Sequence, residues 1–238
     1  MKVALKILLV AAVVVLAYMC YKSITGPIEF NTEKELRDKA IIARLIDIRK
    51  AQIEYKNVYK THAGNFDDLG KFLKTAKLPL VIKEGVLTDE QLEKGMTEKK
   101  AVALIEKAKK TGNWSEVEKE GLKGFKRDTA WVLAKDTLLG KDYDVDGMRY
   151  VPGVPGEKIE FHMDTATLKS GSGYEIKVFV CEVPFDSYLR GMDPQLEYNL
   201  KDKAVKQNKY PGLRVGSLEE INNNAGNWEK SVMFLWRF

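Results

Sequence analysis

Three aspartates alternate along one short stretch of the chain, Asp142-Tyr143-Asp144-Val145-Asp146-Gly147. Alternating carboxylates followed by glycine are typical of the opening of a calcium-binding loop, because the carboxylates point inward and glycine permits the sharp turn. The twelfth position of such a loop is normally a bidentate Glu, but here it is Gly153, and Arg149 occupies the eighth position, where an apolar residue is usual. A polar turn between two strands explains the same residues. Asp142, Asp144 and Asp146 are therefore the one candidate metal site, and calcium is the candidate ion.

Other residue types that perform chemistry are sparse. The two histidines, His62 and His162, have no Cys or His neighbour at the spacing of zinc ligands. The two cysteines, Cys20 and Cys181, lie far apart and predict no disulfide framework. The sequence contains no Gly-rich phosphate loop and no nucleophile elbow. We therefore predict no catalytic and no cofactor-binding residue, and expect a non-enzymatic protein.

One further polar stretch, residues 222–227, is rich in Asn and precedes Trp228. It is either a polar binding loop with an aromatic platform or a structural loop, since Asn and Gly tolerate left-handed backbone and Trp commonly fills a core. The chain carries a net charge of +5, and its lysines are interspersed with acids. That pattern is typical of solvated helix faces and predicts no nucleic-acid partner.

An uncharged apolar segment near the N-terminus, residues 7–21, predicts contact with a lipid bilayer. If Lys6 snorkels, the stretch extends back to Val3 and reaches about the minimum length that crosses a bilayer, roughly 20 residues. Three interpretations compete: an uncleaved anchor, a cleaved signal peptide, and a lipoprotein signal that ends at Cys20. Bulky Tyr18 and Met19 before Cys20 favour the anchor. Positive charges lie on both sides of the segment and leave its orientation ambiguous. The short tail followed by an apolar run has the layout of a signal anchor, which favours an inner-membrane, single-pass protein with an extracytoplasmic domain.

The elements beyond the anchor indicate an α+β fold. Gly26-Pro27 is expected to interrupt the helix after the anchor. An amphipathic helix is predicted near 32–60, with Ile41, Leu45, Ile48 and Gln52 on one stripe, and a short helix is predicted from Phe66. Charged helices are expected within 88–124, the first opened by a capping box at Thr88. Strands are expected at 130–139, 148–151, 158–163 and 174–183 in an antiparallel meander, followed by a helix at 194–207.

These elements predict three regions. Residues 1–24 form the transmembrane anchor, residues 25–127 a mainly helical region, and residues 128–238 a region rich in antiparallel β-structure with a late helix. The last two regions are expected to form one globular unit. Met233 to Phe238 make an apolar end that is expected to dock on the domain or on a partner.

Two stretches resemble known proteins. Ala51-Gln52-Ile53-Glu54-Tyr55, followed by Gly64-Asn65-Phe66 and Leu69, resembles the end of the N-terminal helix in type IV pilin-like proteins and pseudopilins. Residues 210–218 and 222–229 are similar to uncharacterised envelope proteins of Bacteroidetes. The processing site of the pilin family, a Gly before the apolar helix and a Glu after it, is absent near Met1 to Leu9. Gly26-Pro27 is expected to break what is one long helix in that family.

The resemblance implies a membrane-anchored structural or assembly protein of the bacterial envelope, with membrane-protein partners or self-association. The alternative is a membrane-tethered extracytoplasmic domain that binds a ligand or calcium, or that acts as a sensor.

Overall fold

The computed structural model describes residues 2–156 and 158–229, which form helices and antiparallel sheets, so the predicted α+β class is confirmed. Contacts divide the chain into two compact units. The first unit contains the described residues up to Leu73 and from Tyr143 onward, and the second is Lys74–Asp142. The division expected at residues 127 and 128 falls inside a strand of the second unit, β2 (Lys126–Leu133).

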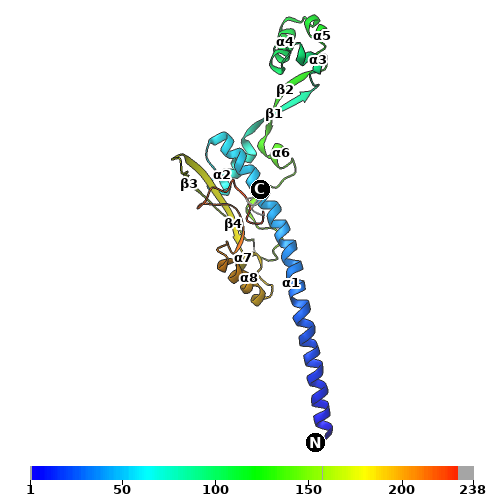
Figure 1. Cartoon of the computed structure of the whole chain (residues 1–238), viewed down its shortest axis with the longest axis vertical. Helices are drawn as coiled ribbons and strands as arrows, with labels where there is room; N and C mark the ends of the chain where they lie inside the picture. Colours follow the sequence, from blue (N-terminus) through cyan, green and yellow to red (C-terminus); the bar gives the residue numbers. More distant parts are fainter. Residues whose placement is uncertain (1, 157, 230–238) are drawn as a thin grey trace, which may run out of the picture. The chain divides into compact units, whose positions relative to one another are not determined.

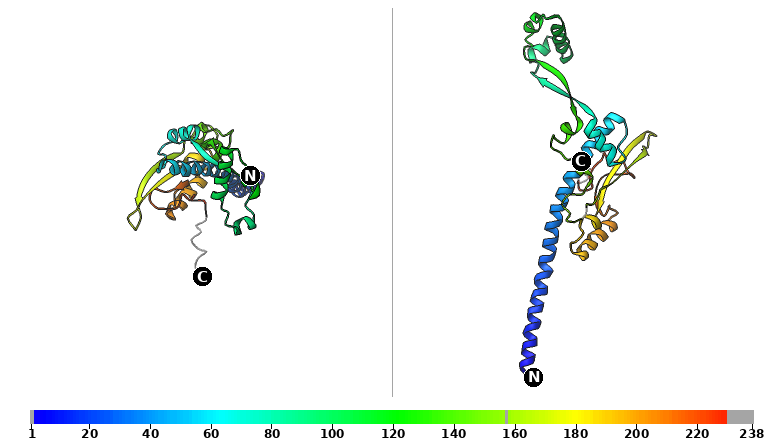
Figure 2. Two further views of the ribbon diagram at one scale, coloured as in Figure 1. Left: turned by 90° about the horizontal axis from the view of Figure 1, so that it is seen from above. Right: turned by 180° about the vertical axis from the view of Figure 1, so that it is seen from behind.

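The first unit is built on one long helix, α1 (Lys2–Tyr59), which Figures 1 and 2 draw in blue and cyan. Pro27 lies inside this helix, so the predicted interruption at Gly26-Pro27 is wrong. A proline inside a helix costs about 3 kcal/mol, because it removes one backbone hydrogen bond and crowds the preceding turn. Long helical runs continue on both sides and outweigh this local cost. The Thr25 hydroxyl also donates to the Tyr21 carbonyl at 3.0 Å, as polar side chains often do beside a helical proline.

The second half of α1 buries one stripe against the rest of the first unit. The predicted positions Ile41, Leu45, Ile48 and Gln52 are all fully buried, which confirms this part of the amphipathic helix. The next helix, α2 (Phe66–Thr75), begins where the sequence predicts and buries Leu69, Phe72 and Leu73. Aromatic contacts join α1 and α2. The ring centroids of Tyr55 and Tyr59 on α1 lie 5.3 and 5.9 Å from the ring centroid of Phe72 on α2.

A three-stranded antiparallel sheet of order β3-β4-β5 completes the core of the first unit. Its strands are β3 (His162–Lys169), β4 (Glu175–Pro184) and β5 (Gly212–Gly216), and β4 is the central strand. The helices α7 (Phe185–Tyr188) and α8 (Pro194–Lys206) lie between β4 and β5 in the chain. Gly212 and Gly216 allow β5 to approach β4, because a Cβ atom at either position would collide with a β4 carbonyl oxygen.

The predicted β-rich region is only partly confirmed. The strand expected at 174–183 is β4 and the helix expected at 194–207 is α8. Of the stretch expected as a strand at 148–151, Met148 and Arg149 belong to the 3-10 helix η1 (Asp146–Arg149), whereas Tyr150 forms an antiparallel bridge with Glu160. The strand expected at 158–163 begins only at His162, after an isolated bridge between Tyr150 and Glu160.

The second unit contains a two-stranded antiparallel ribbon, with three helices between its strands and a fourth helix after them. The ribbon pairs β1 (Lys77–Glu84) with β2, so the strand expected at 130–139 ends at Leu133 and is followed by α6 (Ala134–Leu138). The helices α3 (Asp89–Glu93), α4 (Glu98–Thr111) and α5 (Ser115–Lys119) lie within the range predicted for charged helices. They enclose a small apolar core that includes Ile105, Val117 and Phe125.

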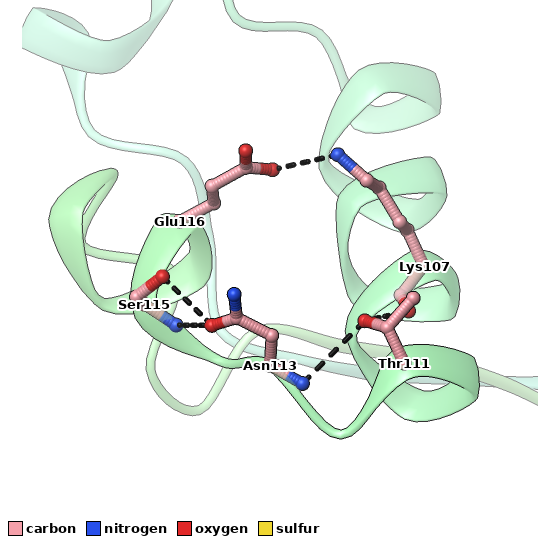
Figure 3. A network of polar contacts seen from close by, with 5 residues as sticks. All are labelled: Lys107, Thr111, Asn113, Ser115 and Glu116. Atoms are coloured by element: carbon pink, nitrogen blue, oxygen red, sulfur yellow. Dashed lines mark hydrogen bonds and ion pairs between the residues drawn. The ribbon is translucent and has the colours of Figure 1, made fainter.

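Polar side chains define the ends of these short helices. The capping box at Thr88 is confirmed, since its hydroxyl accepts from the Gln91 amide and the Gln91 side chain accepts from the Thr88 amide. Between α4 and α5, the side-chain oxygen of Asn113 accepts from both the amide and the hydroxyl of Ser115, at 3.0 and 2.7 Å (Figure 3). Lys107 of α4 also pairs with Glu116 of α5 at 3.1 Å. These local bonds hold the turn between α4 and α5.

Candidate functional site

The first half of α1 presents an apolar surface to its surroundings. Its large apolar side chains from Val3 to Ile24 keep 56 to 71% of their surface exposed. Among the described residues, α1 is the one helix that is long and apolar enough to cross a membrane. Covering a large aliphatic side chain is worth about 1.5 to 3 kcal/mol, and an exposed apolar surface of this extent is typical of a contact site.

A buried arginine joins the second half of α1 to the sheet side of the first unit. The Arg37 side chain is 7% exposed, and its Nε lies 2.8 Å from Glu33 Oε1 one turn earlier. Arg37 Nη1 donates to the carbonyl of Tyr188 at 2.8 Å and to that of Arg190 at 3.3 Å. Arg37 therefore satisfies the backbone at the end of α7, and it fixes that segment to the helix.

The aromatic side chain of the same segment reaches back to α1. The fully buried Tyr188 donates from its hydroxyl to Asp38 Oδ1 at 2.7 Å. Asp38 Oδ2 in turn pairs with Lys34 at 2.5 Å. Burial, and then the nearby Asp38 carboxylate, raise the pKa of Tyr188 far above its ordinary value, so the phenol stays protonated and remains a donor. Together, Lys34, Arg37, Asp38 and Tyr188 form a polar clamp between α1 and α7.

Gln52 fixes the loop that follows the C-terminal end of α1. Its side-chain amide donates to the Ala63 carbonyl at 2.8 Å and accepts from the Ala63 amide at 2.9 Å. This paired contact holds the loop between α1 and α2 in the way that a neighbouring strand would. The stretch with the pilin-like pattern therefore has a structural role, because Gln52 positions the chain that leads into Gly64 and Phe66.

His62, in the same loop, is buried against the sheet. Its ring lies 4.8 Å from that of Phe179, and both ring nitrogens lack a hydrogen-bond partner among the described residues. Burial, and then the nearby charge of Lys56, lower the pKa of His62 to about 4. His62 is therefore neutral at neutral pH. The nearby Lys56 ammonium donates to the Lys177 carbonyl at 2.8 Å.

The three aspartates of the candidate calcium loop are not gathered around one point. Within residues 2–156 and 158–229, no three His, Cys, Asp or Glu side chains come together so as to hold a metal ion. Asp144 Oδ1 accepts from the Gly147 amide at 3.0 Å, and Asp146 begins η1, whereas Asp142 belongs to the other unit. Arg44 fills the space beside the turn and donates to the Gly147 carbonyl at 2.5 Å. This geometry favours the polar turn over the calcium loop.

The Asn-rich loop is also used structurally. Asn223 and Asn224 have φ of 53° and 59°, the left-handed backbone that Asn tolerates. The Asn227 side chain donates to the Gly212 carbonyl at 2.8 Å and accepts from the Arg214 amide at 3.1 Å, so it pairs with the exposed edge of β5. These contacts favour the structural interpretation of residues 222–227. The apolar end from Met233 to Phe238 lies outside the described residues.

The polar clamp is the feature that sequence reasoning missed. One signal was present, because Arg37 lies four residues before Ile41 on the apolar stripe of the helix. A charge at such a position requires a partner from another part of the chain. That partner, the segment at Tyr188, is 151 residues away, and a single sequence does not identify it.

Comparison of the chain with models of protein families, with curated proteins and with solved structures finds no match.

Proposed function

We propose that this chain is a membrane-anchored structural or assembly protein of the bacterial envelope, with α1 as its single-pass anchor and both units outside the cytoplasm. One observation carries the proposal. The same helix is apolar and exposed in its first half, and buried and clamped to the first unit in its second half. Such a helix fixes the first unit at a defined position relative to the bilayer. That arrangement suits a protein that presents a surface to other membrane proteins.

The continuous helix also supports the pilin-like interpretation. The expected break at Gly26-Pro27 was a departure from the architecture that the resemblance implies, and that departure is removed. The second half of the helix packs beside an antiparallel sheet, which is the other architectural feature that the resemblance implies. We therefore favour self-association or a complex with other envelope proteins over ligand sensing, for which the aspartate loop offers no gathered site.

Anchoring is tested by placing charges in the apolar half of α1. Val13 and Val14 are 57 and 62% exposed, and replacing both with Asp adds about 5 to 7 kcal/mol to membrane insertion. The matched control changes Leu36 and Val58, which are 59 and 46% exposed on the second half of the same helix. We expect the wild type and the control to stay in membranes after alkaline carbonate washing, and the Val13→Asp/Val14→Asp chain to be released. Release of the wild type would contradict anchoring.

Orientation and assembly need a second experiment on the full chain. Intact spheroplasts are treated with protease, and a parallel sample is crosslinked, purified through the chain and analysed by mass spectrometry. We expect external protease to digest both units, and crosslinks to join the chain to envelope proteins or to a second copy. Protection from the protease would place the units in the cytoplasm. A chain that stays monomeric without any crosslinked partner would contradict the assembly role.

A further inference from the structure

Beside the buried stripe of α1 runs a second apolar stripe that is only partly covered. It consists of Ile42, Ile46 and Ile53, with Arg49 between them, and each lies one residue after a position of the buried stripe. One residue turns the helix by about 100°, so the four side chains share one flank of α1. Ile42 and Ile46 are partly exposed, and Ile53 is 38% exposed. This flank therefore keeps apolar surface that another segment can cover.

Arg49 fixes the end of the described chain at this flank. Its Nη1 lies 2.7 Å from Glu229 Oε1 and donates to the Asn224 carbonyl at 3.4 Å. Glu229 is also tied to the Asn-rich loop, because its amide donates to the Gly226 carbonyl at 3.0 Å and its Oε2 accepts from the Gly226 amide at 3.3 Å. The chain therefore leaves Glu229 beside the second stripe, next to the Arg49 side chain.

The next nine residues, 230–238, lie outside the described residues, but their sequence and length bear on what covers the stripe. Six of them are large and apolar: Val232, Met233, Phe234, Leu235, Trp236 and Phe238. Fully extended, nine residues span at most about 30 Å. Along α1, Ile53 and Ile42 lie about 6 and 10 Å from Arg49, whereas a bilayer core that ends near Lys22 is about 40 Å away. The second stripe is therefore the nearer apolar surface.

We propose that residues 230–238 fold back along α1 of the same chain and cover the stripe of Ile42, Ile46 and Ile53. Attachment at Glu229 favours this segment over a second copy, because a short tether gives an effective concentration of about millimolar, far above that of separate micromolar copies. The bound segment adds apolar contacts to the Arg49–Glu229 pair. While it is bound, this flank of α1 is closed to partner proteins.

The test places a photoreactive benzophenone amino acid at position 53 of the full chain in phosphatidylcholine vesicles. The matched control carries it at position 58. Val58 is 46% exposed on the same helix and within reach of the segment, but five residues turn it about 140° away from Ile53. The vesicles contain equal amounts of unlabelled copies and copies labelled with heavy nitrogen. After illumination, mass spectrometry identifies the joined peptides and the label of each.

We expect position 53 to join residues 230–238 of the same chain, so that both peptides of each pair carry the same label. Position 58 should give few such pairs. A reciprocal probe at Phe234 leaves the sequence of α1 unchanged, and it should attach to the peptide that contains Ile42 and Ile46.

Two variants separate apolar docking from mere proximity. Leu235→Ser/Trp236→Ser removes two large apolar side chains, each of which changes the docking equilibrium by about tenfold or more when it is buried. We therefore expect this variant to lose most of the adduct at position 53. The control Leu80→Ser/Trp131→Ser makes the same exchange at side chains that are 45 and 64% exposed on the ribbon of the second unit, and it should leave the yield unchanged.

Three results would overturn the proposal. One is an equal yield at positions 53 and 58, because the segment would then have no fixed place on α1. Another is mixed labels in half of the joined pairs, which would mean that the stripe binds a second copy. The third is that position 53 joins lipid or other parts of the chain and not residues 230–238.

Discussion

Replacing Arg37 with Met tests whether the polar clamp holds α1 to the first unit. The substitution keeps an unbranched apolar stem close in size to that of Arg but removes the donors to the Tyr188 and Arg190 carbonyls. Loss of one partner from a buried charged contact costs about 3 to 5 kcal/mol. Glu33 is 46% exposed and regains water when Arg37 is lost, so we expect the lower end, about 3 kcal/mol.

Lys39 provides a matched control on the same helix. Lys39 and Glu35 form a pair with the same one-turn spacing as Arg37 and Glu33, but the side chains are 71 and 68% exposed. Exposed pairs of this kind contribute about 0.3 to 0.5 kcal/mol. Lys39→Met should therefore change the free energy of unfolding by less than about 0.5 kcal/mol. The contrast between the two variants isolates the contacts of the buried guanidinium from the loss of one positive charge.

The measurement is a urea titration of the full-length chain in detergent micelles, followed by hydrogen exchange and mass spectrometry. Peptides from α2 and from β3 to β5 report on the first unit separately from the second. With an m-value of about 2 kcal/mol/M, a loss of about 3 kcal/mol lowers the midpoint by about 1.5 M. If Arg37→Met and Lys39→Met shift the midpoint equally, the clamp does not stabilise the first unit and the reasoning is refuted.

Three further predictions concern single side chains. Because burial lowers the pKa of His62 from its ordinary 6.5 to about 4 in the folded chain, the unfolded chain binds more protons between these values. The wild type should therefore lose about 3 kcal/mol as the pH falls from 6.5 to 4, and His62→Phe should lose less in the same urea titrations. Thr88→Ala removes the capping box and should cost about 1 kcal/mol, seen as faster exchange of peptides covering α3 while peptides from α4 are unchanged. Calorimetry should give the same heat of calcium addition for the wild type and Asp144→Ala, and a saturable signal confined to the wild type would restore the calcium loop.

Elements whose determinants are local could be predicted from the sequence. The stripe at Ile41, Leu45 and Ile48, the start of α2 at Phe66 and the capping box at Thr88 each depend on residues within one or two helical turns. The same holds for α8, which has Asp193 as its N-cap and a proline in its first turn. Side-chain spacing and capping therefore suffice for these helices.

Pairing between strands could not be predicted in the same way. β1 and β2 pair from Lys77 with Leu133 to Glu84 with Lys126, and the helices α3 to α5 separate them in the chain. Alternation identifies an extended segment, but it does not select a partner strand. The sequence therefore placed β2 with the later strands, although its partner is a strand that precedes the helices.

The two features of the candidate site also differ in whether they depend on local or distant residues, and this difference bears on function. The exposed apolar half of α1 could be predicted from composition alone, whereas the clamp at Arg37 depends on Tyr188, which is 151 residues away. A flexible tether would need the helix to end between these two features, at Gly26-Pro27, and it does not end there. Because the helix is continuous from the apolar half to Arg37, the clamp links the apolar half to α7, and bending is confined to what Pro27 allows. If this helix is the membrane anchor proposed above, its continuity supports the proposed assembly role, in which the position of the domain above the membrane determines which partners it meets.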